Sequence, residues 1–322
     1  MTAPTTAAPP APPIGPGSAA ADRYKWVALS NTTVGVLLAT IDASIMLIAM
    51  PDIFRGIGLN PLAPGHSFYL LWSILGFLVV SSVLVVSLGR LGDILGRVRM
   101  YNLGFVVYTV ASLILALDPL KGPSGAIWLI VGRIVQGIGA AFLLANSAAI
   151  LTDAFPAHQR GMALGINNIA GISGVFIGLV LGGLLGPIDW RLIFLVSVPF
   201  GAFGTVWSYL KLRDTGVRRK APIDWAGNLT FAAGLILVMV GITYGIEPAG
   251  GSTTGWTSAP VLIELTLGVA LLVAFAFIEK RVREPMFRLP LFKIRAFTCG
   301  TLASFLSAVG RGGLMFMLII WL

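Results

Sequence analysis

Long apolar runs alternate with short polar segments along most of the chain. A helix needs about 20 apolar residues to cross the hydrocarbon core of a bilayer. Eight apolar runs in the chain are complete, and a ninth begins near residue 297 and is still apolar at Leu322. The runs exceed the length of barrel strands and lack period-2 alternation, so the pattern predicts an all-α integral membrane protein with about nine transmembrane helices. The eight complete runs are 26–50, 67–88, 100–117, 125–150, 162–186, 192–210, 226–246 and 260–278.

Composition supports this class and argues against others. Only 11% of the residues are charged and 57% are hydrophobic, whereas a soluble domain carries roughly 25% charged residues. The net charge of +9 is compatible with a nucleic-acid partner, but the basic residues lie in short segments between apolar runs. We therefore expect a lipid bilayer and no nucleic acid. One cysteine and two histidines predict no metal site, and no nucleophile–base set or phosphate loop points to an enzyme or a cofactor.

The distribution of Lys and Arg predicts the orientation in the membrane. With the N-terminus in the cytoplasm, the inner segments hold 17 of these residues and the outer segments hold 3. Cytoplasmic segments of membrane proteins carry an excess of Lys and Arg. The asymmetry predicts a multi-pass protein of the plasma (inner) membrane with a cytoplasmic N-terminus.

Two long basic segments, 211–224 and 279–296, divide the runs into groups. The beginning of the chain is rich in Ala and Pro and lacks charge, which is typical of disorder. No polar flank follows the last run, so we expect the chain to be truncated at the end of a helix. The expected parts are a disordered cytoplasmic tail (1–25), a first six-helix bundle (26–212), an inserted two-helix hairpin with basic cytoplasmic linkers (213–296), and the first helix of an incomplete second bundle (297–322).

Three ionisable residues lie well inside apolar runs: Asp42, Arg133 and Arg311. Each costs several kcal/mol in hydrocarbon unless it is paired or hydrated. At a rise of about 1.5 Å per residue, all three lie at similar depth in the outer half of the membrane. One water-filled cavity is therefore expected to hold them, with Asp42, Arg133 and Arg311 serving either proton coupling or a static structural charge pair.

The polar segment 89–99, Gly-Arg-Leu-Gly-Asp-Ile-Leu-Gly-Arg-Val-Arg, separates two apolar runs. Such a segment cannot lie in hydrocarbon, so it is predicted to be a tight loop at the water interface. Its glycines, Gly89 and Gly96 among them, let helix ends approach closely. Asp93 lies near Arg97 and Arg99, which predicts a charge latch that holds one helix arrangement, although the arginines could serve topology alone.

Glycines recur along the run 162–186. Four-residue spacing places Gly174, Gly178 and Gly182 on one helix face, where the absence of side chains lets another helix pack closely. The pattern fits generic helix packing or a role in gating.

Four motifs on these runs resemble those of the major facilitator superfamily and, within it, the fourteen-span drug/proton antiporters. They are the 89–99 segment, the R-x-x-Q-G motif at Arg133, Gln136 and Gly137, the antiporter motif at Gly165, Gly174, Gly178, Gly182 and Gly183, and a first-span motif that includes Asp42. The order of the motifs and the runs that carry them also match that family.

The resemblance implies a secondary active transporter without a cofactor, driven by the proton gradient, with Arg133 in proton coupling. It implies export of a small amphipathic or lipophilic compound by alternating access, and we expect a monomer. Leu179 replaces the proline of the antiporter motif, and Leu47 stands where asparagine is usual. These departures leave open a symporter or facilitator of the same superfamily. The expected truncation also leaves open a non-transporting membrane protein.

Overall fold

The computed structural model describes residues 19–60, 63, 66–214, 224–246, 254–282, 285 and 289–321. Within these ranges the side chains of a few residues, Arg311 among them, lie outside the description. Every regular element in the described part of the chain is helical, and eight helices are long and apolar enough to cross a membrane. The predicted all-α membrane protein is thus confirmed.

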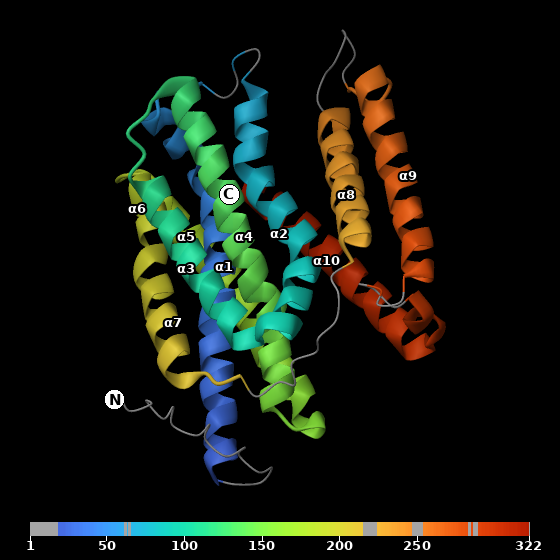
Figure 1. Ribbon diagram of the computed structural model, residues 1–322. Helices are drawn as coiled ribbons and strands as arrows, with labels where there is room; N and C mark the ends of the chain where they lie inside the picture. Colours follow the sequence, from blue (N-terminus) through green and yellow to red (C-terminus); the bar gives the residue numbers. More distant parts are fainter. Residues whose placement is uncertain are drawn as a thin grey trace, which may run out of the picture.

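The helices follow the predicted runs in order (Figure 1). Chain order gives α1 (Ala19–Gly56), α2 (Ser67–Leu95), α3 (Arg97–Ala116), α4 (Gly122–Ala154), η1 (Ala157–Gln159), α5 (Arg160–Leu185), α6 (Arg191–Leu195), α7 (Ser197–Lys211), α8 (Trp225–Ile246), α9 (Ala259–Arg281), η2 (Leu289–Lys293) and α10 (Arg295–Trp321). The ninth predicted run corresponds to α10, which is helical but is not among the eight spanning candidates found in the described residues.

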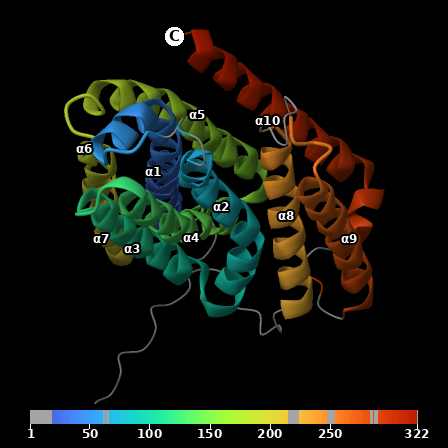
Figure 2. The same cartoon turned by 90° about the horizontal axis from the view of Figure 1, so that it is seen from above.

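The helices α1 to α7 pack together as one bundle, which Figure 2 shows from above. The helix α1 packs along α5 and α4, α4 also packs along α2 and α3, and α7 covers α3 and α1. Two apolar cores fill the bundle, one around Phe54 and Phe194 and the other around Tyr101 and Leu143. The interior of α1 and α4 between these two cores is where the buried charges lie.

The predicted run 192–210 forms two helices instead of one. The helices α6 and α7 are separated at Val196, three residues before Pro199. Proline has no backbone N–H, so the carbonyl group of Leu195 loses its helical partner. The two helices together still make one candidate crossing over Arg191–Lys211.

The prediction of a tight loop over residues 89–99 is wrong for all but one residue. The helix α2 continues to Leu95 and α3 begins at Arg97. Gly96 alone reverses the chain, with φ of +110°, a value that only glycine adopts without strain. Its N–H group still donates to the Gly92 carbonyl oxygen at 2.9 Å. Polar turns of both helices therefore extend beyond the apolar layer with their backbone groups paired.

The helix α1 also begins earlier than predicted. Residues 19–25, assigned to the disordered tail, are helical, whereas residues 1–18 lie outside the described part of the chain. Lys25 Nζ contacts Asp22 Oδ1 at 2.8 Å and Gln159 Oε1 at 3.1 Å. These polar contacts tie the first turns of α1 to the turn before α5, which extends the helix past its apolar stretch.

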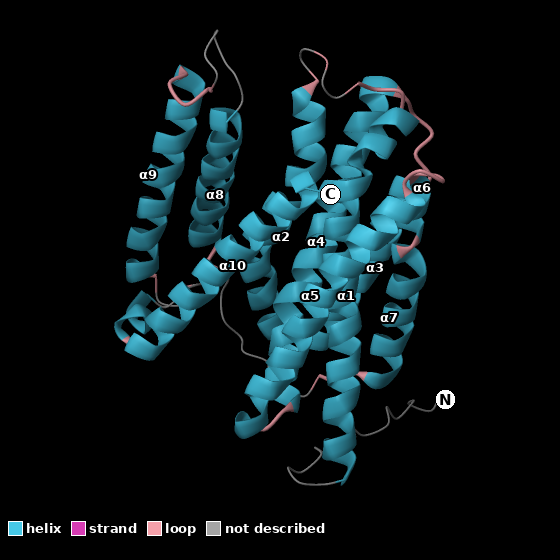
Figure 3. Ribbon diagram, turned by 180° about the vertical axis from the view of Figure 1, so that it is seen from behind, coloured by secondary structure: helices cyan, strands magenta, loops and turns pink. Residues whose placement is uncertain are grey.

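The helices α8 and α9 form a pair beside α2 (Figure 1). They approach closely at Gly234 and Gly268, because a methyl group on either would lie 3.0 Å from the carbonyl oxygen of the other. Polar contacts with α2 include the Trp72 indole N–H and the Tyr244 hydroxyl at 3.4 Å. Figure 3 shows α10 running obliquely past this pair, and its residues 299–310 are exposed. The division into a bundle, an inserted hairpin and a second bundle stays a prediction.

Candidate functional site

Two opposite charges meet at the centre of the bundle. Asp42 of α1 is fully buried and Arg133 of α4 is 1% exposed. Nη1 of Arg133 donates to Oδ2 of Asp42 and forms an ion pair. A buried charge without a partner is strongly destabilising, so the charge of each residue compensates the buried charge of the other. Their direct contact agrees with the prediction that they lie at similar depth.

Gln136 completes the coordination of this pair. It lies three residues after Arg133 on α4 and therefore shares its helix face. Its Nε2 donates to Asp42 Oδ1 and to Ser112 Oγ, both at 2.9 Å, and its Oε1 accepts from Arg133 Nη1 at 2.6 Å. Both oxygens of Asp42 are thereby occupied, and α1, α3 and α4 are joined through one polar network.

Ser112 is a member of this network that the sequence alone does not reveal. Its hydroxyl donates to the Tyr108 carbonyl oxygen at 2.8 Å, one turn earlier on α3, and accepts from Gln136. A lone serine in an apolar run ordinarily bonds its own helix backbone. Only the packing of α3 against α4 shows that the Ser112 hydroxyl oxygen also accepts a hydrogen bond from Gln136 in the charge network.

The Arg133 guanidinium is held incompletely. Its Cζ lies 4.3 Å from the centre of the Phe77 ring, in a cation–π arrangement. Its Nε has no hydrogen-bond partner among the described residues, and neither does the Tyr108 hydroxyl. The guanidinium therefore has one buried donor that neither Asp42 nor Gln136 satisfies.

A cavity of about 380 Å³ adjoins this pair between α1, α2, α4 and α5. Arg133 lines it, and the remaining lining is mainly apolar. Asp42 is not among the lining residues, so the expectation of one cavity shared by all three charges is wrong for Asp42, which is fully buried against the Arg133 guanidinium. The side chain of Arg311 lies outside the described residues. Leu47 and Leu179, the two departures from the family pattern, both line the cavity.

The glycines of α5 divide into two groups. A methyl group on Gly174 or Gly178 would overlap α1, and one on Gly182 would lie 2.8 Å from the Ile45 carbonyl oxygen. By contrast, a methyl group on Gly165 meets nothing within 4 Å, and one on Gly183 makes an ordinary contact at 3.9 Å. The predicted close packing is confirmed for the three glycines of one face, and their partner is α1.

Gly137 has a comparable place on α4. A methyl group there would lie 2.9 Å from the Phe77 carbonyl oxygen on α2. The glycine therefore permits the close approach that brings the Phe77 ring beneath Arg133.

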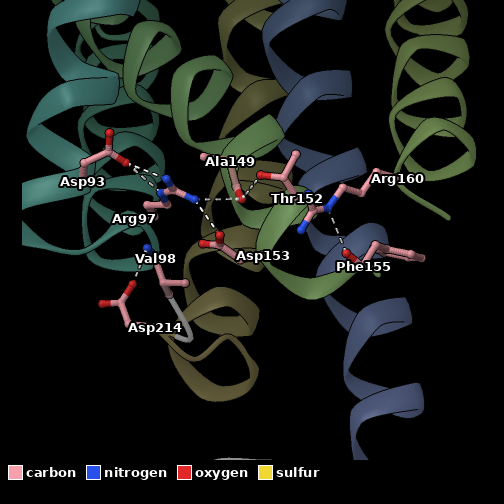
Figure 4. Close-up of polar contacts among 9 residues, drawn as sticks. All are labelled: Asp93, Arg97, Val98, Ala149, Thr152, Asp153, Phe155, Arg160 and Asp214. Atoms are coloured by element: carbon pink, nitrogen blue, oxygen red, sulfur yellow. Dashed lines mark hydrogen bonds and ion pairs between the residues drawn. The ribbon is translucent and has the colours of Figure 1, made fainter. Parts of the chain in front are cut away.

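A second polar cluster lies where α2 meets α3 (Figure 4). Arg97 Nε donates to Asp93 Oδ1 at 2.9 Å, and its Nη1 donates to Asp153 Oδ1 at 2.7 Å and to the Ala149 carbonyl oxygen at 3.3 Å. One arginine thus joins the ends of α2, α3 and α4. Asp153 was not identified from the sequence alone. The feature that could have indicated it is an acidic residue at the end of an apolar run, in a segment predicted to face the cytoplasm.

Arg99 does not belong to this cluster. It is exposed and makes no hydrogen bond or ion pair among the described residues. Two positions along a helix turn a side chain by about 200°, so Arg97 and Arg99 point to opposite sides of α3. The predicted latch therefore consists of Asp93, Arg97 and Asp153.

Two further acids occupy helix ends. Asp214, after α7, accepts a hydrogen bond at 2.8 Å from the backbone N–H of Val98 in the first turn of α3, which satisfies a donor that helices leave open. Asp118, between α3 and α4, accepts at 2.8 Å from the N–H of Leu120. Burial raises the pKa of the Asp118 carboxyl above its ordinary value, although the Leu120 hydrogen bond and the charge of Arg191 partly oppose this.

The described residues contain no group of three His, Cys, Asp or Glu side chains arranged to hold a metal ion. The central site consists of a buried ion pair beside a mainly apolar cavity.

Comparison with known proteins places these motifs in a family. Residues 32–322 match the family described as the Major Facilitator Superfamily. The riboflavin transporter RibZ of Clostridioides difficile is 29% identical over 286 residues, which are 87% of this chain and 57% of that protein. The puromycin resistance protein pur8 of Streptomyces alboniger is 30% identical over 267 residues, which are 82% and 50% of the two chains.

Multidrug resistance protein 3 of Bacillus subtilis is 27% identical over 290 residues, which are 88% of this chain and 52% of that protein. The chain spans about half the length of the curated relatives it matches. These are names of transporters and resistance proteins, in agreement with the prediction that the chain is not an enzyme. The family match and the apolar helices of the bundle lead to one conclusion: this chain is a multi-pass membrane protein that belongs to the Major Facilitator Superfamily.

Proposed function

We propose that this chain takes part in proton-coupled export of small amphipathic or lipophilic compounds by alternating access. The observation that carries the proposal is the buried Asp42–Arg133 pair, whose guanidinium lines an apolar cavity. Similarity to proteins named for multidrug and puromycin resistance supports export as the direction. Because the chain spans about half of those relatives, the activity is proposed for the product of the complete reading frame that contains it.

The coupling step begins at Asp42. A proton that binds to its carboxylate removes the negative charge that Arg133 pairs with. The guanidinium would then be a buried charge without compensation, a state that costs about 3–5 kcal/mol. A two-state equilibrium moves from 1:99 to 99:1 with about 5.5 kcal/mol, so this single protonation supplies much of the energy for a conformational change. Arg133 relieves the imbalance by turning toward the cavity that it already lines.

The Asp93–Arg97–Asp153 cluster serves as a releasable latch on the cytoplasmic side. The side chains of Arg97 and Asp153 are 28% and 24% exposed, and exposed ion pairs contribute only about 0–1 kcal/mol each. Such a cluster holds three helix ends together and still opens when the bundle rearranges. Its cytoplasmic position, with a cytoplasmic N-terminus in the plasma membrane, is supported by the 17-to-3 division of Lys and Arg.

The cavity lining supports lipophilic substrates. Leu47 and Leu179 add apolar surface where the resembling family carries asparagine and proline. A cavity of about 380 Å³ fits a small molecule, and apolar burial rather than ion pairing would provide most of the affinity.

A symporter or facilitator of the same superfamily is the second candidate. Leu179 favours it, because the leucine removes a helix-bending residue from the helix that the family associates with antiport. Protons that enter the cytoplasm as substrate leaves indicate antiport, whereas protons that travel with the substrate indicate symport.

The proposal is tested with Asp42→Asn in the complete reading frame. Everted membrane vesicles that accumulate a fluorescent lipophilic dye would report transport, with and without an imposed pH gradient. We expect the variant to insert normally and to lose gradient-driven transport. Asp52→Asn is the matched control, because Asp52 lies on the same helix but pairs with the exposed Arg55 at 3.0 Å. Wild-type transport by Asp42→Asn would refute proton coupling at this site.

A further inference from the structure

One continuous face of α2 lines the cavity beside the central ion pair. The lining residues of α2 are Ile74, Phe77, Leu78, Ser81 and Ser82, and their spacing of three and four residues places them in one row along the helix. The row is about 12 Å long. Its first three members are apolar and its last two are serines. A molecule that lies along this row would meet apolar side chains at one end and hydroxyl groups at the other.

Four hydroxyl groups line the cavity, and three of them already donate to their own helix. Thr40, Ser44 and Ser81 each donate to a backbone carbonyl oxygen in the preceding turn, at 2.8, 2.9 and 3.0 Å. Serine and threonine within helices often satisfy their hydroxyl groups in this way. Ser82 differs, because it is exposed and its hydroxyl makes no hydrogen bond with the part of the chain that the structure describes. The row on α2 therefore presents one hydroxyl that is free to donate to a bound molecule.

The charge nearest to the cavity is positive. Of the described residues that line the cavity, Arg133 alone carries a charge, and its partner Asp42 is not in the lining. The ion pair is therefore a dipole whose positive end adjoins the cavity. Because the surroundings are mainly apolar, charges interact more strongly here than in water. A cation in the cavity would lie closer to the guanidinium than to the carboxylate, whereas the negative end of a neutral molecule's dipole would be attracted.

We propose that the cavity selects uncharged amphipathic compounds that carry a strong hydrogen-bond acceptor, such as a carbonyl, N-oxide or phosphoryl oxygen. The inference rests on the proposed function, because it names the substrate class of the cavity assigned to export. The Ser82 hydroxyl donates to the acceptor oxygen, and the field of Arg133 orients the polar bond. The apolar part of the compound packs along Phe77 and Leu78.

The same lining disfavours two other classes of compound. A pure hydrocarbon that displaces water from Ser82 leaves the hydroxyl without a partner, which costs affinity. A lipophilic cation meets the positive end of the ion pair and offers Ser82 no acceptor. Specificity at this cavity therefore depends on a donor and a dipole, with apolar burial common to all three classes.

The test compares three molecules of similar shape. Triphenylphosphine oxide is neutral and has a phosphoryl acceptor, methyltriphenylphosphonium is a cation, and triphenylmethane is neutral without an acceptor. The purified product of the complete reading frame is placed in lipid nanodiscs, and equilibrium binding is measured by dialysis without a pH gradient. We expect the oxide to bind more tightly than the other two. Partition into the lipid is the same for every protein variant, so differences between variants report the protein site.

Two neighbouring serines provide the matched variants. Ser82→Ala should weaken binding of the oxide by about two- to tenfold, the equivalent of one hydrogen bond, and leave binding of the hydrocarbon and the cation unchanged. Ser81→Ala is the control, because Ser81 lines the same cavity but its hydroxyl already donates to Leu78. Ser82→Thr keeps the hydroxyl and should bind the oxide like wild type. The unfolding temperature of Ser82→Ala should equal that of wild type, since the hydroxyl has no partner within the described residues.

Several results would overturn the proposal: tightest binding of the phosphonium, equal binding of the oxide and the hydrocarbon, no measurable binding of the oxide, or equal losses in Ser82→Ala and Ser81→Ala. The binding assay does not depend on proton coupling. A preference for the oxide, in a protein whose Asp42→Asn variant transports like wild type, would support this substrate class and refute the proposed coupling.

Discussion

The contact between α5 and α1 gives the sharpest prediction, through the substitution Gly178→Ala. A methyl group at this position would overlap the Ile41 carbonyl oxygen and the Ser44 hydroxyl. Ser44 cannot easily turn away, because its Oγ bonds the carbonyl oxygens of Thr40 and Ile41 at 2.9 Å and 3.0 Å. The clash therefore involves backbone atoms, and α1 must move away from α5.

The expected magnitude follows from overpacking and helix propensity. Overpacking by one methyl group costs about 1–3 kcal/mol. Gly165→Ala on the same helix enters open space and gains up to about 1 kcal/mol from the helix propensity of alanine. The two single-methyl variants should therefore differ in stability by about 1–4 kcal/mol, although they are the same chemical change on one helix.

Thermal unfolding in detergent, followed by intrinsic fluorescence, provides the comparison. Gly178→Ala should unfold at a lower temperature than wild type, and Gly165→Ala at the same or a higher temperature. The shift of α1 would also displace Asp42, which follows Ile41 in the chain, so transport should fall in the first variant only. Equal unfolding temperatures for the two variants would show that α1 and α5 do not pack through this glycine face.

Three other predictions concern the two ends of the bundle. Asp153→Asn should reduce transport strongly but lower the free energy of unfolding by only about 0–1 kcal/mol, since the ion pair of Asp153 with Arg97 is partly exposed. Parallel efflux and unfolding assays would show whether the two effects separate. Gly96→Ala should destabilise by about 1–3 kcal/mol, because φ is +110° and the new methyl group would meet the Asp214 carboxylate; an unfolding temperature equal to wild type would contradict the turn geometry. The pKa of Asp118 is raised in the folded protein, so its favourable contribution to the free energy of unfolding is present at low pH and is lost as pH rises through the folded-state pKa. Asp118→Asn should therefore unfold at a higher temperature than wild type at neutral pH and lose this advantage in acid. A difference in unfolding temperature that does not change with pH would argue against the effect of burial.

Much of the architecture was predictable because its causes are local. A helix that crosses hydrocarbon must be apolar over a definite length, so the sequence alone indicates the spans. A charge within a span must find a partner, which identified Asp42 and Arg133 and their similar depth. Four-residue glycine spacing likewise predicted a contact face on α5. These inferences need only the periodicity of a helix and the energetics of a charge in an apolar medium.

The partners of these groups required the tertiary structure. Ser112, Asp153 and Asp214 gain their roles from helices distant in sequence, and the rotation and separation of packed helices decide which side chains meet. The same geometry distinguishes Gly178, where an added methyl group would overlap α1, from Gly165, where it would meet nothing within 4 Å. It also puts Arg133, but not Asp42, among the residues that line the cavity. Sequence periodicity specifies the face of one helix, but contact between two helices depends on their mutual orientation, which the whole bundle determines.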